Sequence, residues 1–258
     1  MHSCQHLSES LRLSLTVCLS TNQCLKSCVM SSIGSDGRVR ALFRGSDAVC
    51  FDVDSTVCRD EAIDEIAKFA GKEKEVMEMT RRAMRGSCSF REALAQRLDL
   101  IQPNVQMLKD YVRTHPPRLT PGIKELVNLL HAREIDVYLV SGGFYSVIEG
   151  VAKELHIPVK NIFANRIKFY FDGSYAGFDE TEPTSQQDGK AQVIAYLKHL
   201  QGYQRVTMIG DGVTDLEACP PGDAFIGFGG NQIRERVKKE SKWFVTSFYD
   251  LIEELNRN

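Results

Sequence analysis

Two aspartates near residue 50 could carry out chemistry on a phosphate group. Residues 48–51 are apolar and predict a buried strand, and Asp52 and Asp54 follow it. In an extended chain, side chains two residues apart point to the same side, so the two carboxylates would lie together. Buried together they need a cation, and a divalent ion such as Mg2+ suits hard oxygen ligands. In phosphoryl transfer, one carboxylate would attack phosphorus while the other handles the proton.

The same segment also has an interpretation without catalysis. A string of Asp, Ser and Thr after a strand is typical of a polar turn that caps the next helix. A calcium-binding EF-hand loop is excluded, because no Gly follows Thr56 and Ile63 stands where that loop needs Glu. Other segments of the chain therefore decide between catalysis and a simple turn.

A second pair of carboxylates follows another apolar run. Residues 205–210 predict a buried strand that leads into Gly-Asp-Gly, and Thr214 and Asp215 then open a helix. Asp211 and Asp215 would add oxygen ligands, or anions just outside the ligands, to the same metal site. Asp215 could instead be only a favourable charge at the helix N-terminus.

Two more segments could bind a phosphate. Residues 137–140 predict a third strand, which ends in Ser141, Gly142 and Gly143. The hydroxyl and the backbone N–H groups of such a loop can bind phosphate oxygens. Lys190 begins a predicted helix, where the helix dipole disfavours a lysine unless an anion lies nearby. Taken alone, an ordinary loop and a solvated lysine are the commoner explanations.

Together, these segments resemble the haloacid dehalogenase superfamily of phosphohydrolases. Three of them follow apolar strands, and ligands in open α/β sheets bind at the carboxyl ends of strands. Further segments look like the phosphoserine phosphatase family of that superfamily. They are Glu61, Arg97 and residues 51–56, 79–84, 119–122, 140–144 and 227–231. The resemblance begins near residue 40 and reaches the C-terminus.

The resemblance implies a Mg2+-dependent phosphatase that hydrolyses O-phospho-L-serine to L-serine and phosphate, the last step of serine biosynthesis. Asp52 would form an aspartyl-phosphate. Asp54 would protonate the leaving oxygen and then activate the attacking water. Mg2+ would be held by Asp52, the backbone carbonyl of Asp54 and Asp211, with Asp215 just outside these ligands.

Ser141 and Lys190 complete the predicted catalytic set by stabilising charge on the phosphoryl oxygens. An intact set argues against a catalytically silent binding protein on the same fold, which is the alternative from another class. Among enzymes, the alternative is a phosphatase or phosphotransferase for another small phosphomonoester.

Substrate selection is expected from the region after the first strand. By resemblance, Glu61 would bind an ammonium group and Arg97 a carboxylate, while Met84 and Phe90 form an apolar wall. The other predicted substrate contacts are Ser141, Gly142, Gly143, Lys190 and Thr214. Without the resemblance, a first-turn helix acid, a solvated arginine and ordinary packing would be the preferred explanations. Arg85 departs from the family pattern, which tends to have Gly there.

The composition is that of an ordinary soluble globular protein. The 258 residues carry a formal net charge of −2, and 43% of them are hydrophobic. This charge argues against a nucleic-acid or membrane-surface role, and no apolar run approaches the length of a membrane span. We therefore expect a cytoplasmic enzyme with a small-molecule substrate, and the resemblance implies a homodimer.

The first 37 residues differ from the rest of the chain. They are rich in Ser and Cys and poor in acidic residues. We expect a disordered extension. Arg12 and Lys26 are too few basic residues for a convincing transit peptide, so organellar targeting is the less favoured alternative.

The order of elements predicts an α/β fold, with a Rossmann-like parallel sheet flanked by helices. Residues 60–115 show helical spacing and no strand signal, so we expect a helical cap inserted after the first strand. Pro116 and Pro117 would end it. Residues 167–175 alternate around an Asp-Gly pair and predict a small β-hairpin. The expected units are a core of residues 38–58 and 116–258, and a cap of residues 59–115.

Overall fold

The computed structural model describes residues 34–83 and 89–257. The chain divides into two units, residues 1–38 and 39–258. Of the first unit, only residues 34–38 are described, and they include the start of helix α2 (Ser35–Arg44). Residues 35–37 of the expected disordered extension therefore belong to a helix, whereas residues 1–33 of it lie outside the described residues. The predicted site residue Met84 and its neighbour Arg85 also lie outside the described residues.

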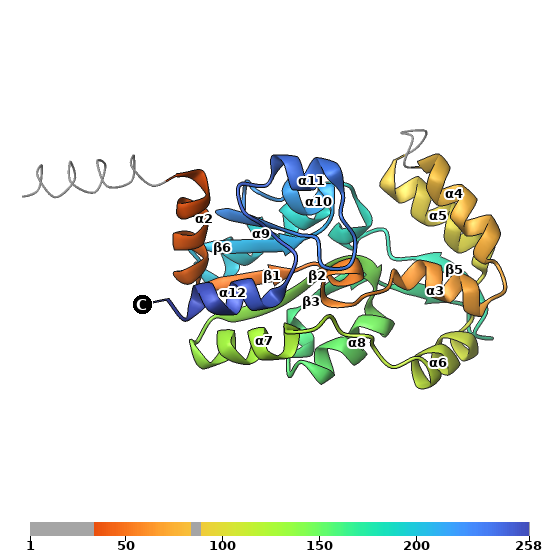
Figure 1. Cartoon of the computed structure of the whole chain (residues 1–258). Helices are drawn as coiled ribbons and strands as arrows, with labels where there is room; N and C mark the ends of the chain where they lie inside the picture. Colours follow the sequence, from red (N-terminus) through yellow and green to blue (C-terminus); the bar gives the residue numbers. More distant parts are fainter. Residues whose placement is uncertain (1–33, 84–88, 258) are drawn as a thin grey trace, which may run out of the picture. The chain divides into compact units, whose positions relative to one another are not determined.

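A six-stranded parallel sheet forms the centre of the second unit (Figure 1). In the order in which they lie in the sheet, the strands are β3 (Ile162–Asn165), β2 (Asp136–Phe144), β1 (Ala48–Phe51), β6 (Val206–Gly210), β7 (Ala224–Phe228) and β8 (Phe244–Val245). Strand β1 lies between β2 and β6 and pairs with both in parallel. The three strands that were predicted to carry the catalytic carboxylates and the Ser-Gly-Gly segment are therefore neighbours. This confirms the α/β fold class.

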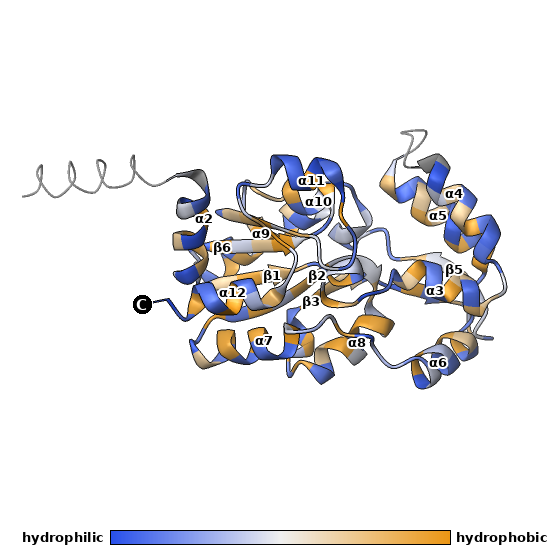
Figure 2. Ribbon diagram, viewed as in Figure 1, coloured by the Kyte–Doolittle hydropathy of each residue, from blue (hydrophilic) through white to orange (hydrophobic). Residues whose placement is uncertain are grey.

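Helices cover both faces of this sheet (Figure 1). One face carries α7 (Ile123–Ala132), α8 (Tyr145–Glu154) and α12 (Phe248–Leu255), and Phe43 of α2 joins the core on that side. The other face carries α9 (Gly189–Gln201), α10 (Val213–Leu216) and α11 (Glu235–Glu240). Hydrophilic and hydrophobic residues alternate around the flanking helices α7 and α12, as Figure 2 shows. Each helix therefore buries one side and exposes the other.

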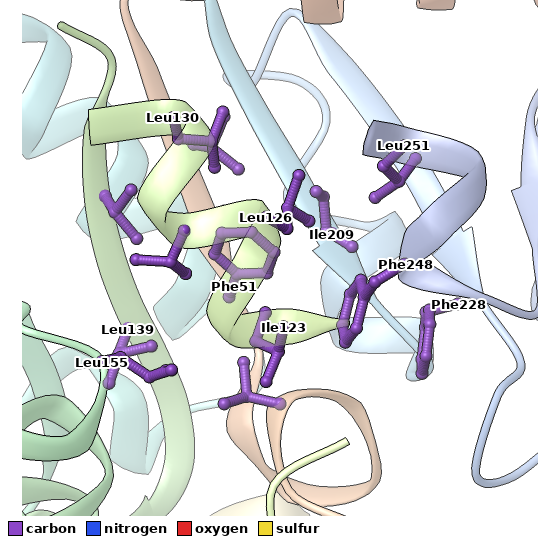
Figure 3. Packing of buried hydrophobic residues seen from close by; sticks show 14 of the residues in the cluster. Phe51, Ile123, Leu126, Leu130, Leu139, Leu155, Ile209, Phe228, Phe248 and Leu251 are labelled. Carbon is purple, nitrogen blue, oxygen red and sulfur yellow. The ribbon is translucent and has the colours of Figure 1, made fainter. Parts of the chain in front are cut away.

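The strands supply side chains alternately to the two cores. Phe51 and Ile209 belong to the core beneath α7 and α12, whereas their neighbours Cys50 and Met208 belong to the opposite core. Phe248 packs edge-on against Phe51 with ring centroids 6.2 Å apart (Figure 3). Complete burial of one such apolar side chain contributes about 1.5–3 kcal/mol, so the two cores hold the strand ends in a fixed arrangement.

Four helices lie between β1 and α7 and form a separate hydrophobic cluster. They are α3 (Ala62–Phe69), α4 (Glu73–Ala83), α5 (Phe90–Ile101) and α6 (Val105–Thr114). Ile66, Val76 and Leu98 are fully buried in this cluster. The antiparallel hairpin of β4 (Ile167–Phe169) and β5 (Tyr175–Phe178) packs against the same cluster. The predicted hairpin therefore completes the packing of the cap helices.

The chain enters and leaves the cap region at adjacent positions. Cys58 and Leu119 form an isolated antiparallel bridge. Arg59 N donates to Arg118 O at 3.0 Å. Because the two connections between the core and the cap lie side by side, the helices between them can form one insertion. The boundaries at residues 58/59 and 115/116 stay a prediction.

Two features differ from the sequence-based expectations. Strand β3 has only four residues, too few to show a clear alternation, and the sequence pattern did not predict it. Strand β2 continues to Phe144, so Ser141, Gly142 and Gly143 end a strand and do not form a loop. The pairing of β2 with β3 is irregular between Val140 and Phe144, which allows the strand to bend there.

The remaining short elements are η1 (Val53–Val57), η2 (Val159–Asn161) and η3 (Pro183–Ser185). In the part of the chain that the structure describes, no helix combines the length and the apolar composition that a membrane crossing requires.

Candidate active site

The turn after β1 places both aspartates of the first motif. In η1, Ser55 has a left-handed backbone with φ of 56°, and Cys58 N donates to Val53 O at 2.8 Å to close the turn. Asn231, from the loop after β7, donates its Nδ2 to Ser55 O at 3.1 Å and to Thr120 Oγ1 at 2.7 Å. This bracing holds the turn against the core and thereby orients Asp52 and Asp54.

A cavity of about 400 Å3 lies between the carboxyl ends of the strands and the cap helices. Eleven of the predicted site residues line it: Asp52, Asp54, Glu61, Phe90, Arg97, Gly142, Gly143, Lys190, Asp211, Thr214 and Asp215. Ser141 is completely buried beside the lining residue Gly142. Residues that are up to 163 positions apart in the chain thus meet in one cavity.

An acidic cluster lies on the core side of this cavity. One carboxylate oxygen from each of Asp52, Asp211 and Asp215 lies within 4.8 Å of the other two, and all three residues are buried. Lys190 Nζ donates to Asp52 Oδ1 and to Asp215 Oδ1, each at 2.6 Å. Three buried carboxylates with one shared ammonium are a donor set that fits a hard divalent cation.

The acidic cluster carries more negative charge than its hydrogen-bonded cations neutralise. Burial raises the pKa of Asp215 to about 7, and Asp52 adds to this rise while Lys190 opposes it. Burial also raises the pKa of Asp211 to about 6, with a further contribution from Asp52 and opposition from Arg234. Burial alone would lower the pKa of Lys190, but Asp215 and Asp52 outweigh it and raise that pKa. These carboxylates would ionise more readily with a metal ion among them.

Asp54 is suited to hold a proton. Burial raises the pKa of its carboxyl group well above the usual value, and the charges of Glu61 and Asp52 raise it further. Its Oδ1 accepts a hydrogen bond from Ala62 N at 3.0 Å. A Cβ atom on Gly143 would lie only 2.8 Å from Asp54 Oδ2, so glycine is needed there. A protonated carboxyl in such a cavity can act as a general acid.

The Ser-Gly-Gly segment contacts both the core and the cap. Ser141 Oγ accepts a hydrogen bond from Gly143 N at 2.9 Å, which leaves the hydroxyl hydrogen available to a phosphate oxygen. A Cβ on Gly142 would lie 2.8 Å from the ring of Phe90. Glycine at this position therefore lets the cap helix α5 approach the strand end closely.

Glu61 and Arg234 link the cap to the acidic cluster. Glu61 Oε1 accepts hydrogen bonds from Ser55 Oγ at 2.8 Å and from Arg234 Nη2 at 3.1 Å. Arg234 Nε donates to Asp211 Oδ2 at 2.7 Å. Arg234 was missed by sequence reasoning, because it lies 173 residues from Glu61. The only signal is its position shortly after segment 227–231, which belongs to the resemblance.

The cap side of the cavity carries one further cation and a hydroxyl without a partner. Arg97 lines the cavity, and its Nε donates to Ala93 O at 2.9 Å. Burial raises the pKa of nearby Asp64, and Arg97 opposes that rise. Thr80 also lines the cavity, and its buried Oγ1 has no hydrogen-bond partner among the described residues. Thr80 lies in segment 79–84 of the resemblance but was not singled out from the sequence.

Comparisons with known proteins identify the family of this chain. The family model of haloacid dehalogenase-like hydrolases matches residues 46–220. The chain is 57% identical to rat phosphoserine phosphatase over 221 residues, which cover 86% of this chain and 98% of the rat protein. It is 48% identical to the chloroplastic phosphoserine phosphatase of Arabidopsis thaliana over 235 residues, which cover 88% of this chain and 80% of that protein.

A solved structure of a related protein supports the same family. The crystal structure of a phosphoserine phosphohydrolase-like protein from Francisella tularensis superposes with a TM-score of 0.69 at 30% identity, and the match covers 80% of this chain and 98% of that one. The chain therefore belongs to the phosphoserine phosphatase family of haloacid dehalogenase-like hydrolases, and it is a phosphatase.

Proposed function

We propose that this enzyme uses Mg2+ to hydrolyse O-phospho-L-serine to L-serine and phosphate through an aspartyl-phosphate on Asp52. One observation carries the proposal. The cavity has a buried carboxylate cluster with Lys190 on one side, and Glu61 and Arg97 on the cap side. The carboxylate cluster with Lys190 suits phosphoryl transfer. Glu61 and Arg97 suit the ammonium and carboxylate groups of an amino acid.

Asp52 would attack phosphorus. Lys190 Nζ holds its Oδ1 at 2.6 Å, so the other carboxylate oxygen is the nucleophile. As the bond from Asp52 to phosphorus forms, the bond from phosphorus to the serine oxygen breaks, and Asp54 gives its proton to that oxygen. Asp54 then takes a proton from water, which attacks phosphorus and releases phosphate from Asp52. Lys190 and Ser141 offer positive charge and a hydroxyl hydrogen to the phosphoryl oxygens.

The metal would be held by Asp52, Asp211 and the backbone carbonyl of Asp54. Asp215, which is bonded to Lys190, would lie outside these ligands and orient Lys190. When bound, Mg2+ supplies charge neutralisation, so that an anionic nucleophile can approach a phosphate dianion. The described donor set consists of oxygens, which favours Mg2+ over softer metals.

The pKa shifts of Asp211 and Asp215 predict a pH-dependent effect of metal on stability. In chelator-treated protein, both carboxyls hold protons at a pH where the unfolded chain has lost them, so folding stability falls as pH rises from about 4 to about 7. Protons also compete with the metal. We therefore expect Mg2+ to raise the melting temperature more at about pH 8 than at about pH 5.5.

Asp211→Asn is the matched variant for this measurement, because it removes one ligand charge with little change in shape. It should lose most of the stabilisation by Mg2+ at both pH values. An equal rise in melting temperature at the two pH values in the parent protein would contradict the link between these carboxyls and the metal.

Glu61, Arg97 and Phe90 would select the substrate. Glu61 would attract the ammonium group, and Arg97 can bind a carboxylate through two parallel hydrogen bonds. Phe90 lies against Gly142, so its ring closes the space beside the phosphate site and suits a short side chain. None of the three would take part in transferring phosphorus. Met84 stays a predicted part of this wall.

Arg97→Ala should therefore weaken the binding of phosphoserine and spare simple phosphate esters. We expect KM for phosphoserine to rise by an amount that corresponds to ~2–4 kcal/mol, because a bidentate, charge-assisted pair with the carboxylate is lost. Hydrolysis of an aryl phosphate, which has no carboxylate, should barely change. Steady-state kinetics with both substrates measure this difference.

Arg113→Ala is a suitable control for Arg97→Ala, because Arg113 is an exposed arginine of the cap helix α6 that pairs with Asp110. It should leave both substrates unaffected. If Arg97→Ala impaired both substrates equally, Arg97 would stabilise the cap or bind phosphate, and amino-acid recognition would need another cation.

The proposed reaction is tested by phosphate release from a panel of phosphorylated metabolites, with and without Mg2+. Phosphoserine should give the highest kcat/KM, and a chelator should abolish the release. A higher kcat/KM for a phosphate ester without an amino group would favour the alternative of another small phosphomonoester. Transfer of the phosphoryl group to an added alcohol in place of water would identify a phosphotransferase.

From the family resemblance, we further propose that the enzyme is a cytoplasmic homodimer that completes serine biosynthesis. Light scattering on the full chain would measure its oligomeric state.

A further inference from the structure

Arg234 connects Asp211, a predicted metal ligand, with Glu61, which is predicted to bind the substrate. Its Nε donates to Asp211 Oδ2 at 2.7 Å, and its Nη2 donates to Glu61 Oε1 at 3.1 Å. The other oxygen of Asp211 has only a long contact of 3.4 Å with Thr56 Oγ1. The guanidinium is therefore the main hydrogen-bond partner of Asp211 among the described residues.

The charges around Arg234 are unbalanced. Five carboxylates line the cavity: Asp52, Asp54, Glu61, Asp211 and Asp215. Lys190 and Arg234 are the cations that the structure places in hydrogen-bond contact with carboxylates of this set. Even with a proton on Asp54 and with Arg97 counted, four carboxylates face three cations in this cavity, so the net charge stays negative and favours retention of Lys190 and Arg234 while no metal is present.

The two cations differ in how easily they can leave. The Lys190 side chain is only 9% exposed and holds two buried carboxylates at 2.6 Å each. The Arg234 side chain is 27% exposed, and its partner Glu61 is 35% exposed. A guanidinium at the edge of the cavity can therefore turn into water at a lower cost than the buried ammonium can.

We propose that Arg234 takes the place of the divalent cation in the metal-free enzyme and couples metal binding to recognition of the substrate's amino group. Metal binding requires Asp211, so the ion displaces the guanidinium from that carboxylate. Arg234 then keeps a single, partly exposed bond to Glu61, which an ammonium group can replace. The amino-group part of this inference rests on the proposed function, whereas the competition with metal does not.

The same contacts would also allow Arg234 to support the metal site, and that role predicts the opposite change in metal affinity when Arg234 is removed. If Arg234 merely oriented Asp211 for the metal, removing Arg234 would weaken metal binding, as loss of a supporting hydrogen bond does. If Arg234 competes with the metal, removing it strengthens metal binding. The sign of the change therefore decides between the two roles.

The first experiment measures the dissociation constant of Mg2+ alone, by calorimetric titration of the chelator-treated full chain. Arg234→Met keeps most of the side-chain length but removes the charge and the donors. We expect it to bind Mg2+ about tenfold more tightly than the parent protein, since one charge-assisted competitor is gone. Arg234→Lys keeps the charge but lacks the two separate donors, so it should show a smaller increase.

The matched control is Arg236→Met. Arg236 lies two residues away in α11, is 56% exposed and pairs with Glu240 and Glu217. It removes the same charge from the same region, so it should change the dissociation constant by less than about twofold. Unchanged or weaker Mg2+ binding in Arg234→Met, with normal thermal unfolding, would overturn the proposal. If Arg234→Met failed to fold, Arg234→Lys would decide in the same way.

The second experiment tests the coupling with L-serine, which has the ammonium and carboxylate groups but no phosphate. In the parent protein, Mg2+ should tighten L-serine binding by about fivefold, and L-serine should tighten Mg2+ binding equally. In Arg234→Met this factor should fall close to one, because Glu61 is available with or without metal. Coupling that persists in Arg234→Met would overturn the link through Glu61.

The two experiments separate this inference from the proposed function. If L-serine failed to bind with or without Mg2+, amino-acid recognition by Glu61 and Arg97 would be wrong. The titration with Mg2+ alone would still decide whether Arg234 competes with the metal.

Discussion

Asp52→Asn should abolish phosphate release while the protein stays folded. An amide is a very poor nucleophile toward phosphorus, so no aspartyl-phosphate can form. The substitution preserves the shape of the side chain and the oxygen that faces Lys190 Nζ. It also removes one negative charge from a cluster with excess negative charge, so chelator-treated Asp52→Asn should melt no lower than the parent protein.

The measurement is phosphate release from phosphoserine at saturating Mg2+, together with a thermal melt. Asp136→Asn is a suitable control, because Asp136 is an exposed aspartate at the start of the neighbouring strand β2. It should retain activity. Phosphate release by Asp52→Asn above a trace of the parent rate would remove Asp52 from its role as the nucleophile.

Asp54→Asn should slow turnover by roughly 10²–10⁴-fold, the usual contribution of a general acid–base group. An asparagine can still accept the hydrogen bond from Ala62 N that holds the side chain in place. It cannot give a proton to the leaving serine oxygen or take one from water. Both the formation and the hydrolysis of the aspartyl-phosphate should therefore be slower.

The pH–rate profile identifies this role more sharply than the rate alone. Burial raises the pKa of Asp54, with Glu61 and Asp52 adding to the shift, so this carboxyl keeps its proton to a higher pH than an ordinary aspartate does. As pH rises through that pKa, Asp54 loses its proton and kcat/KM should fall. This basic limb should be absent in Asp54→Asn. An unchanged profile in the variant would assign the proton transfer to another group.

Much of the catalytic centre could be predicted because its signals are local. Four apolar residues followed by Asp52 are enough to indicate a buried strand with a carboxylate at its end, and the same holds for the strand before Asp211. Parallel strands end at the same edge of a sheet, so their carboxylates were expected to meet. The structure brings them within 4.8 Å of each other.

The helices of the cap were predictable from the sequence, but the way in which other segments pack against them was not. Helical spacing follows from contacts within a few residues, whereas the packing of the β4–β5 hairpin against the cap depends on segments far apart in sequence. The short strand β3 was not predicted for a similar reason. Its four residues form a strand because β2 lies beside them to pair with.

The sequence by itself thus determined which strands carry the carboxylates, in what order they follow one another, and which chemistry they can perform. Only the tertiary structure decided that Arg234, besides the predicted Lys190, pairs with these carboxylates. Arg234 reaches both Asp211 and Glu61, although 173 residues separate it from Glu61 and no periodic pattern links the three. The physical reason is that strand and helix signals arise from neighbouring residues, whereas the pairing of buried charges depends on how loops from distant parts of the chain fold together.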